Sequence, residues 1–399
     1  MPLATSRRAA GIAPSATLAI DARAKEMKKN GEKVIGFAAG EPDFSTPSAV
    51  CDAAHEAINR GFTRYTPTGG IPELKRAICD KFMRDNRLAY EPSNVIVCTG
   101  AKQALMGAFF ACLDPGDEVI IPSPFWVSYP EMVRIAGGVP VCVECFEANG
   151  FVPTIESIRD HVTPRTRAIL INSPSNPTGA IFDRRLLEAI AQLALERRLY
   201  IISDEIYENF LYDGAEHTSI ASLSDAIRAQ TIVVNGVSKT HAMTGWRIGY
   251  AAGPEHIIRA MDSLQSHVTG GPNSIAQYAS LAALQGDHKL VGSMRDEFNA
   301  RRIIMVDRVN RIKGLSAYTP KGAFYVMVNC QAILCRFYNG KQIGTAARFC
   351  EIILEEAKVA AIPGEPFGAP AYIRLSYAVS REDIRDGLDA IDRFVQTLP

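Results

Sequence analysis

The stretch N-G-V-S-K-T-H-A-M-T-G-W-R-I-G-Y, residues 235–250 of this 399-residue chain, decides the fold. The β-branched run at 231–234 precedes it and predicts a buried parallel strand. The chain leaves that strand at Asn235-Gly236, a turn signal, and residues 247–252 predict a second strand. Lys239 therefore lies on a short loop after a buried strand. Burial disfavours the charged ammonium, so it lowers the pKa of the amine and makes it a usable nucleophile or base.

Strands and helices alternate on the N-terminal side of this stretch. Strands are predicted at residues 94–98, 118–121, 139–143, 168–171 and 200–202, with helices at 102–113, 127–136 and 184–197. This alternation predicts an α/β protein with a mostly parallel sheet. After residue 254 the pattern changes to long helices and a few strands, including residues 324–328 and 372–377. We expect residues 46–295 to form a large domain, residues 296–399 a smaller α+β domain, and residues 1–45 an N-terminal arm and part of the small domain.

Polar residues follow four of the predicted strands. A lone loop lysine is more often solvated, but ligands of open parallel sheets bind beyond the carboxyl ends of the strands, where these residues would meet. The turn Thr99–Lys102 precedes a helix and offers backbone N–H groups to a phosphate, although it lacks the P-loop spacing. Asn176 lies in a proline-rich turn and Asp204 ends an apolar strand, where a turn asparagine and a helix cap are the ordinary alternatives.

A lysine, a carboxylate and a phosphate cradle at successive strand ends match the needs of pyridoxal phosphate. The lysine makes a Schiff base, an aspartate keeps the pyridine nitrogen protonated, and a helix N-terminus binds the phosphate. A guanidinium such as that of Arg247 binds phosphate through two parallel N–H groups. Trp126 follows another strand, where its ring could stack on the cofactor.

The composition argues against several other classes of protein. The chain has 43 basic and 43 acidic residues, which gives no indication of nucleic acid or of an acidic membrane surface as a partner. No apolar run approaches the length of a membrane span, and the N-terminus lacks the apolar core of a secretory signal. Nine cysteines predict reduced thiols and a cytoplasmic protein. Cys142 and Cys145 form a C-x-x-C, but it lies in a predicted strand without a second pair, so we expect no metal.

The chain resembles the class I aminotransferases of the aspartate aminotransferase fold, in the bacterial-type subgroup. The resemblance runs from P-S-A-T at residues 14–17 to R-L-S-Y-A at 374–378. Its motifs are A-A-G-E-P-D-F (38–44), Y-T-P-T-G-G (65–70), P-F-W-V-S-Y-P (124–130), N-S-P-S-N-P-T-G (172–179), S-D-E-I-Y (203–207) and S-K-T-x-x-M-T-G-W-R-I-G-Y (238–250).

The resemblance implies pyridoxal 5'-phosphate as cofactor and a role for each motif around its ring. Lys239 would form the Schiff base and then carry the proton from the substrate Cα to the cofactor. Asp204 would pair with the pyridinium nitrogen, and Tyr207 and Asn176 would hydrogen-bond the phenolic oxygen. Trp126 would stack on the ring.

The resemblance also implies how the phosphate is bound. Gly100, Ala101 and Lys102 would supply backbone N–H groups, with Arg247 opposite them. Tyr65 would reach the phosphate of the neighbouring subunit, so the active unit would be a homodimer.

The substrate residues follow in the same way. Arg374 would bind the α-carboxylate, assisted by Gly40 and Asn176 and beside Trp126, and Lys102 would meet the distal carboxylate of a dicarboxylic substrate. The implied activity is ping-pong transfer of the amino group of L-aspartate to 2-oxoglutarate. The open alternatives are aminotransferases of alanine, of aromatic amino acids or kynurenine, or of prephenate, and a pyridoxal-phosphate carbon–sulfur β-lyase.

Two positions depart from the family pattern. Prephenate-active members carry a polar or basic residue just before P-S-A-T, where this chain has Ala13. Many relatives have a serine three residues before the lysine, where this chain has Gly236, so Ser238 is the candidate for the phosphate hydroxyl. Among unrelated classes, a DNA-binding regulator would need a head before the first strand at Val34, and a nicotinamide oxidoreductase would need G-x-G-x-x-G.

Overall fold

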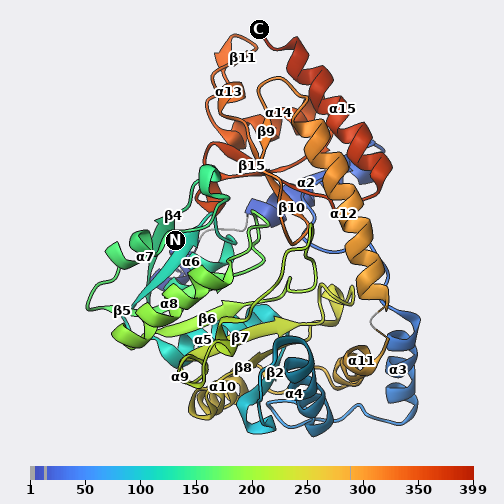
Figure 1. Ribbon diagram of the computed structural model, residues 1–399. Coiled ribbons are helices and arrows are strands. Elements are labelled where there is room, and N and C mark those ends of the chain that lie inside the picture. The colour runs from blue at the N-terminus through green and yellow to red at the C-terminus, as the bar shows by residue number, and fades with distance from the viewer. Residues whose placement is uncertain (1–4, 13–15, 288) are drawn as a thin grey trace.

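A seven-stranded sheet forms the centre of the larger part of the molecule (Figure 1). The computed structural model describes residues 5–12, 16–287 and 289–399. The strand order is β2-β8-β7-β6-β5-β3-β4, and every neighbouring pair is parallel except those that β8 makes with β7 and β2. The strands are β2 (Val95–Cys98), β3 (Glu118–Ser123), β4 (Val139–Glu144), β5 (Thr166–Asn172), β6 (Tyr200–Asp204), β7 (Thr231–Gly236) and β8 (Gly249–Ala252). The α/β prediction is confirmed.

Helices cover both faces of this sheet, which explains why β2, β7 and β8 are buried along their whole length. In β2, Val95 and Val97 pack in one cluster with α4 and α11, whereas Ile96 and Cys98 pack in another with α5 and α10. The covering helices are α3 (Ser48–Asn59), α4 (Pro72–Asn86), α5 (Ala101–Cys112), α6 (Ser128–Ile135), α8 (Arg184–Arg197), α10 (Glu255–Val268) and α11 (Ser274–Gln285). The sequence analysis missed the short helices α7 (Ile155–Asp160) and α9 (Asp225–Arg228).

The strand predicted at 247–252 begins only at Gly249, which corrects its N-terminal limit. Residues Thr244–Trp246 form a 3-10 turn, and Arg247 has a φ of 59°. That left-handed conformation is incompatible with a strand, so the arginine lies in the loop before β8. This loop joins β7 directly to its antiparallel neighbour.

A second, smaller sheet lies above the first in Figure 1, with the order β14-β15-β10-β9 and antiparallel pairing throughout. Its strands are β9 (Ser316–Ala317), β10 (Tyr325–Asn329), β14 (Ile362–Pro363) and β15 (Tyr372–Ser376). The helices α12 (Lys289–Val309), α14 (Ala346–Glu356) and α15 (Arg381–Thr397) belong to this region, and α12 extends down to the large sheet's helices. The short elements are α1 (Arg7–Ala10), α13 (Gln331–Leu334), β11 (Phe337–Tyr338) and β12 (Lys341–Gln342).

The N-terminal segment returns to this second region. After α2 (Ala16–Lys29), the two-residue strand β1 (Ile35–Gly36) pairs in parallel with β13 (Val359–Ala360). The domain limits at residues 45 and 295 stay a prediction. All nine cysteines are free thiols, and no helix among the described residues is long and apolar enough to cross a membrane.

Candidate active site

A cavity of about 380 Å³ opens at the carboxyl ends of β5, β6 and β7. It brings together eleven of the residues selected from the sequence, which are Gly40, Ala101, Lys102, Trp126, Asn176, Asp204, Tyr207, Ser238, Lys239, Arg247 and Arg374. Gly100 lies just behind this lining as the N-cap of α5. Tyr65 does not line the cavity, and its side chain is fully exposed.

Lys239 occupies the cavity wall three residues after the end of β7. Its Nζ donates a 2.6 Å hydrogen bond to the carbonyl oxygen of Gly40. Burial lowers the pKa of the amine to about 8, reinforced by the positive charges of Arg247 and Arg374 and opposed by Glu41. The neutral amine is therefore much more populated near physiological pH than for an ordinary lysine, as a nucleophile or general base requires.

Asp204 is the last residue of β6 and is buried. Tyr129 donates a 2.8 Å hydrogen bond to its Oδ2, and the backbone N–H of Ile206 donates to its Oδ1 at 3.2 Å. Burial raises the pKa of the carboxyl to about 6, and these two hydrogen bonds limit the rise. The carboxylate has no cationic partner in direct contact among the described residues, so a cationic ligand group would stabilise its ionised form.

The sequence analysis missed Tyr129, although the residue lies in the quoted P-F-W-V-S-Y-P motif. It follows Trp126 by three positions where α6 begins, and the two rings pack edge to face with centroids 5.3 Å apart. Trp126 precedes the first residue of α6, so no helical spacing joins the two positions, and no sequence pattern indicated Tyr129.

A cradle for an oxyanion is built between the N-terminus of α5 and Arg247. Gly100 caps α5 with a φ of 80°, and a Cβ added there would lie 2.5 Å from Nη2 of Arg247. A Cβ at Gly249 would lie 2.1 Å from the backbone nitrogen of Ala101. Because neither glycine has a side chain, the guanidinium of Arg247 and the N-terminus of α5 can lie close to each other. Helix N–H groups and a guanidinium are the donors that a phosphate prefers.

The departure at position 236 has a packing reason. A Cβ on Gly236 would lie 3.0 Å from the Cα of Gly249 and 3.1 Å from the carbonyl oxygen of Ile248. A serine there would crowd the backbone of β8 and push the two strands apart. Ser238, by contrast, is buried and lines the cavity, and its role as the phosphate hydroxyl stays a prediction.

Arg374 lies on β15, so the small sheet supplies this side chain to the cavity. Its Nη1 donates to Oδ1 of Asn176 at 3.1 Å and its Nη2 to the carbonyl oxygen of Ala38 at 2.9 Å. Nε has no partner among the described residues, and the guanidinium lies 4.5 Å from the ring centre of Tyr325. The charge is 2% exposed and meets no carboxylate there, so an anionic ligand would supply the missing partner.

Tyr325 is a second residue that the sequence analysis missed. Its hydroxyl lies 3.0 Å from that of Tyr207, and both phenols are buried. Burial raises the pKa of each, so both remain protonated and can donate a hydrogen bond at neutral pH. The apolar run at 324–328 predicted only a strand, and nothing in it indicated which residue would face Tyr207.

Lys102 projects from the first turn of α5 toward Trp126. Its Nζ lies 4.7 Å from the centre of the indole ring and donates to Oγ of Ser128 at 3.3 Å. Burial lowers the pKa of the amine, and the charge of Arg247 adds to the effect. No carboxylate pairs with Lys102 in the described part of the chain, so its charge is available to a ligand in the cavity.

Comparison with known proteins identifies the family. The model of the class I and II aminotransferases matches residues 32–391. The chain is 51% identical to an aspartate aminotransferase of Geobacillus stearothermophilus and 46% identical to an aspartate/prephenate aminotransferase of Thermus thermophilus, with 98% of each chain covered. Among solved structures, the aspartate aminotransferase of Rhizobium meliloti superposes with a TM-score of 0.96 at 44% identity over 100% of both chains. The Thermus thermophilus aspartate aminotransferase with maleate superposes with a TM-score of 0.93 at 46% identity, covering 98% of this chain and 100% of the other.

The chain therefore belongs to the class I and II aminotransferases. It is a pyridoxal-phosphate-dependent enzyme, as the members of this family are. The residues fit that cofactor. An amine of lowered pKa, a buried carboxylate and an oxyanion cradle between the N-terminus of α5 and Arg247 all border one cavity.

Proposed function

We propose that the enzyme transfers the amino group of L-aspartate to 2-oxoglutarate in a ping-pong reaction. The observation that carries the proposal is the pair of cations left without a carboxylate partner in one cavity, Arg374 and Lys102. A dicarboxylic amino acid offers one carboxylate to each. Relatives at 46–51% identity that bear the name aspartate aminotransferase support the same substrate.

We assign the cofactor contacts as follows. Lys239 would bind pyridoxal phosphate covalently, Asp204 would pair with its ring nitrogen, and Tyr207 and Asn176 would donate to its phenolic oxygen. Trp126 covers the ring. The backbone N–H groups of Gly100, Ala101 and Lys102 would hold the phosphate. The hydroxyl of Ser238 and the guanidinium of Arg247 would bind it from the side.

The reaction then depends on proton transfer and on positioning. When bound, pyridoxal phosphate would supply an electron-withdrawing ring, which stabilises the charge left when the Cα–H bond breaks. Once the substrate amine has replaced Lys239 on the cofactor, the freed Nζ can accept the Cα proton, and its lowered pKa favours the neutral form that does so. The carboxylate of Asp204 would keep the ring nitrogen of the cofactor protonated. Arg374, assisted by Gly40 and Asn176, orients the substrate by binding its α-carboxylate.

The same proposal includes a homodimer and a cytoplasmic location. Tyr65 is fully exposed in the single chain, as a residue that reaches a neighbouring subunit's phosphate would be. Nine free thiols agree with a reducing compartment. Ala13, which bears on prephenate as a substrate, lies outside the described residues.

The test is an absorbance spectrum of the purified enzyme during addition of L-aspartate without any keto acid. We expect the cofactor band to shift while one oxaloacetate forms per site. A band that shifts with alanine or phenylalanine but not with aspartate would overturn the substrate assignment and keep the enzyme class. A protein that cannot be loaded with the cofactor would overturn the assignment of Lys239.

A further inference from the structure

Tyr325 is a buried phenol of the catalytic cavity that has no part in the proposed reaction so far. It lies on β10 of the small sheet, is 1% exposed and lines the cavity together with Tyr207 and Lys239. The rings of the two tyrosines pack edge to face with centroids 5.8 Å apart, and Nζ of Lys239 lies 6.0 Å from the ring centre of Tyr207. The two hydroxyls are 3.0 Å apart, and neither has another hydrogen-bond partner among the described residues.

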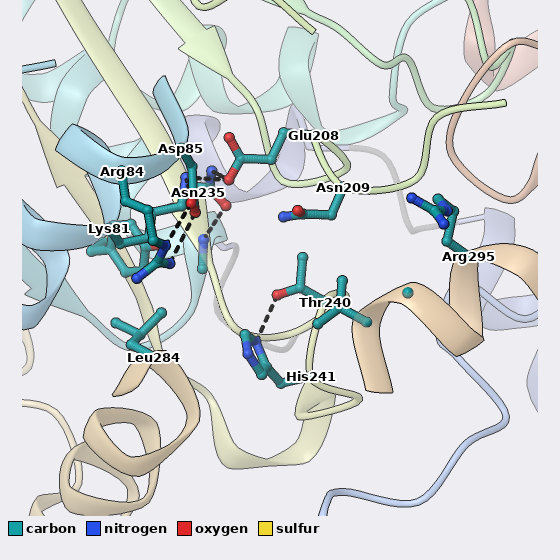
Figure 2. A pocket seen from close by; sticks show the side chains of 14 residues that line it. Lys81, Arg84, Asp85, Glu208, Asn209, Asn235, Thr240, His241, Leu284 and Arg295 are labelled. Atoms are coloured by element: carbon teal, nitrogen blue, oxygen red, sulfur yellow. Dashed lines mark hydrogen bonds and ion pairs between the residues drawn. The ribbon is translucent and has the colours of Figure 1, made fainter. Parts of the chain in front are cut away.

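The ring of Tyr207 is held in place by its surroundings. The next residue, Glu208, lines a second polar cavity behind the loop that carries the catalytic lysine (Figure 2). Its carboxylate accepts from Nζ of Lys81 and, at 2.7 Å, from Nδ2 of Asn235. On the other side, the ring of Tyr207 packs edge to face on Phe324 at 5.4 Å. These contacts fix the ring but leave the phenolic O–H free to rotate, so its direction depends on what its oxygen accepts.

The two phenols can share one hydrogen bond, in which one donates and the other accepts. If Tyr207 donated, the proton of Tyr325 would have no acceptor in the described part of the chain, and Tyr207 would have no proton left for a ligand. If Tyr325 donates, its proton is paired and that of Tyr207 is directed into the cavity. The second arrangement leaves no buried donor unpaired once a ligand oxygen is bound, so it is the favoured one.

Arg374 is placed to act on Tyr325 more than on Tyr207. Tyr325 pairs with Ser376 and Met327 pairs with Arg374, so the tyrosine and the arginine are diagonal neighbours on one face of the small sheet. The guanidinium carbon lies 4.5 Å from the ring centre of Tyr325. A positive charge there stabilises the ionised form of the phenol, which makes its hydroxyl a stronger hydrogen-bond donor.

The other charges around the two phenols favour the same direction. Burial raises the pKa of both, and Arg374 opposes the rise at Tyr325, where Glu41 is the nearby negative charge. At Tyr207 the charge of Asp204 raises the pKa further, and the opposing effect of Arg374 is smaller than the other influences on that pKa. Tyr325 is therefore the more acidic phenol and the better donor of the pair.

We propose that Tyr325 is a positioning residue whose hydroxyl donates to the oxygen of Tyr207, so that the O–H of Tyr207 points at the phenolic oxygen of the bound cofactor. Hydrogen bonds in such a chain polarise one another, so the donation from Tyr325 also strengthens that of Tyr207. The inference rests on the proposed function, which assigns Tyr207 to this oxygen. Tyr325 then affects the cofactor only through Tyr207.

The test is a pH titration of the absorbance of the cofactor-loaded enzyme, which measures the pKa of the cofactor bound to Lys239. Donors to the phenolic oxygen stabilise its ionised form, so losing one raises this pKa. We expect a rise of about 1 to 2 pH units in Tyr207→Phe, which loses a donor to a charged oxygen, and of about 0.4 to 1 in Tyr325→Phe, which loses a donor to a neutral one. The double variant should show no more than the rise of Tyr207→Phe alone.

Tyr377→Phe is the matched control. It removes another fully buried hydroxyl of the small region, which donates to the carbonyl oxygen of Ala323 outside the catalytic cavity, so it should leave the cofactor pKa in place. Tyr325→Phe itself keeps the ring beside Arg374 and removes the hydroxyl alone.

The outcomes separate this inference from the proposed function. A shift in Tyr207→Phe with none in Tyr325→Phe would overturn the positioning role and keep the assignment of Tyr207. Shifts that add in the double variant would overturn it as well, because Tyr325 would then act on the cofactor independently. If Tyr207→Phe left the cofactor pKa unchanged, the assignment of Tyr207 in the proposed function would fail, and the role of Tyr325 with it.

Discussion

Lys239 and Lys81 are both withdrawn from solvent on opposite sides of the same loop, yet their surroundings differ. Lys81 is 3% exposed and contacts the carboxylate of Glu208 and, at 2.7 Å, Oδ1 of Asn86. Lys239 has one backbone carbonyl as its hydrogen-bond acceptor, and burial lowers its pKa to about 8. A buried ammonium that is paired with a carboxylate stabilises structure, whereas one without such a pair is available for chemistry.

The comparison predicts its largest effect at Lys239. Lys239→Ala should lower turnover by roughly 10⁴-fold or more, because the covalent attachment and the proton acceptor are lost together. The variant should still take up pyridoxal phosphate, now without covalent attachment. Steady-state kinetics and the absorbance of the loaded protein check both points, and near-wild-type turnover would refute the assignment.

Lys81→Met should lower the stability of the fold and leave turnover nearly unchanged. Removing one partner of a buried ion pair costs about 3–5 kcal/mol, because Glu208 is left with an uncompensated charge. We expect that loss in the free energy of denaturant unfolding, with turnover of the remaining folded enzyme changed much less. The double variant Lys81→Met/Glu208→Gln should recover part of the stability. A turnover loss as large as that of Lys239→Ala would abolish the distinction between the two lysines.

Lys102 tests whether a third lysine acts on substrate. Lys102→Ala should lower kcat/KM for aspartate roughly tenfold to a hundredfold, the value of a hydrogen bond to a charged group. Alanine has no distal carboxylate and serves as the matched control substrate. If both substrates lost the same factor, Lys102 would contribute to cofactor binding alone.

Tyr129→Phe should give the smallest effect, about threefold to tenfold in kcat/KM at neutral pH. The hydroxyl stabilises the ionised carboxylate of Asp204, so its removal raises the pKa of Asp204 further above its ordinary value. Since the ionised form is the active one, the acidic limb of the pH–rate profile should move to higher pH, while activity above that limb stays near wild type. Tyr90→Phe removes another buried hydroxyl and should leave the profile in place.

The sequence predicted those parts of the site that depend on sheet topology. Asn176, Asp204 and Lys239 follow strands that share a carboxyl edge, so their convergence follows from the α/β pattern alone. The partners Tyr129 and Tyr325 depend instead on how α6 and β10 dock, over sequence separations of 75 and 118 residues. No local pattern encodes such docking.

The fold shows the same division. The apolar run of β8 predicted where a strand lies but not that it runs antiparallel to β7 and β2, because a buried strand is apolar on both faces in either direction. The helices α7 and α9 have six and four residues, too few for a hydrophobic period to be recognised.

The pairing of β1 with β13 has a consequence for synthesis on the ribosome. Ile35 emerges early, but its partner Val359 is translated only near the end of the chain. At about 5–20 residues per second, the first strand waits roughly 15 to 65 s for its neighbour. During that time the large sheet can form while an apolar segment that includes Phe37 stays uncovered. We expect chaperones that bind apolar segments of nascent chains to bind this part of the chain.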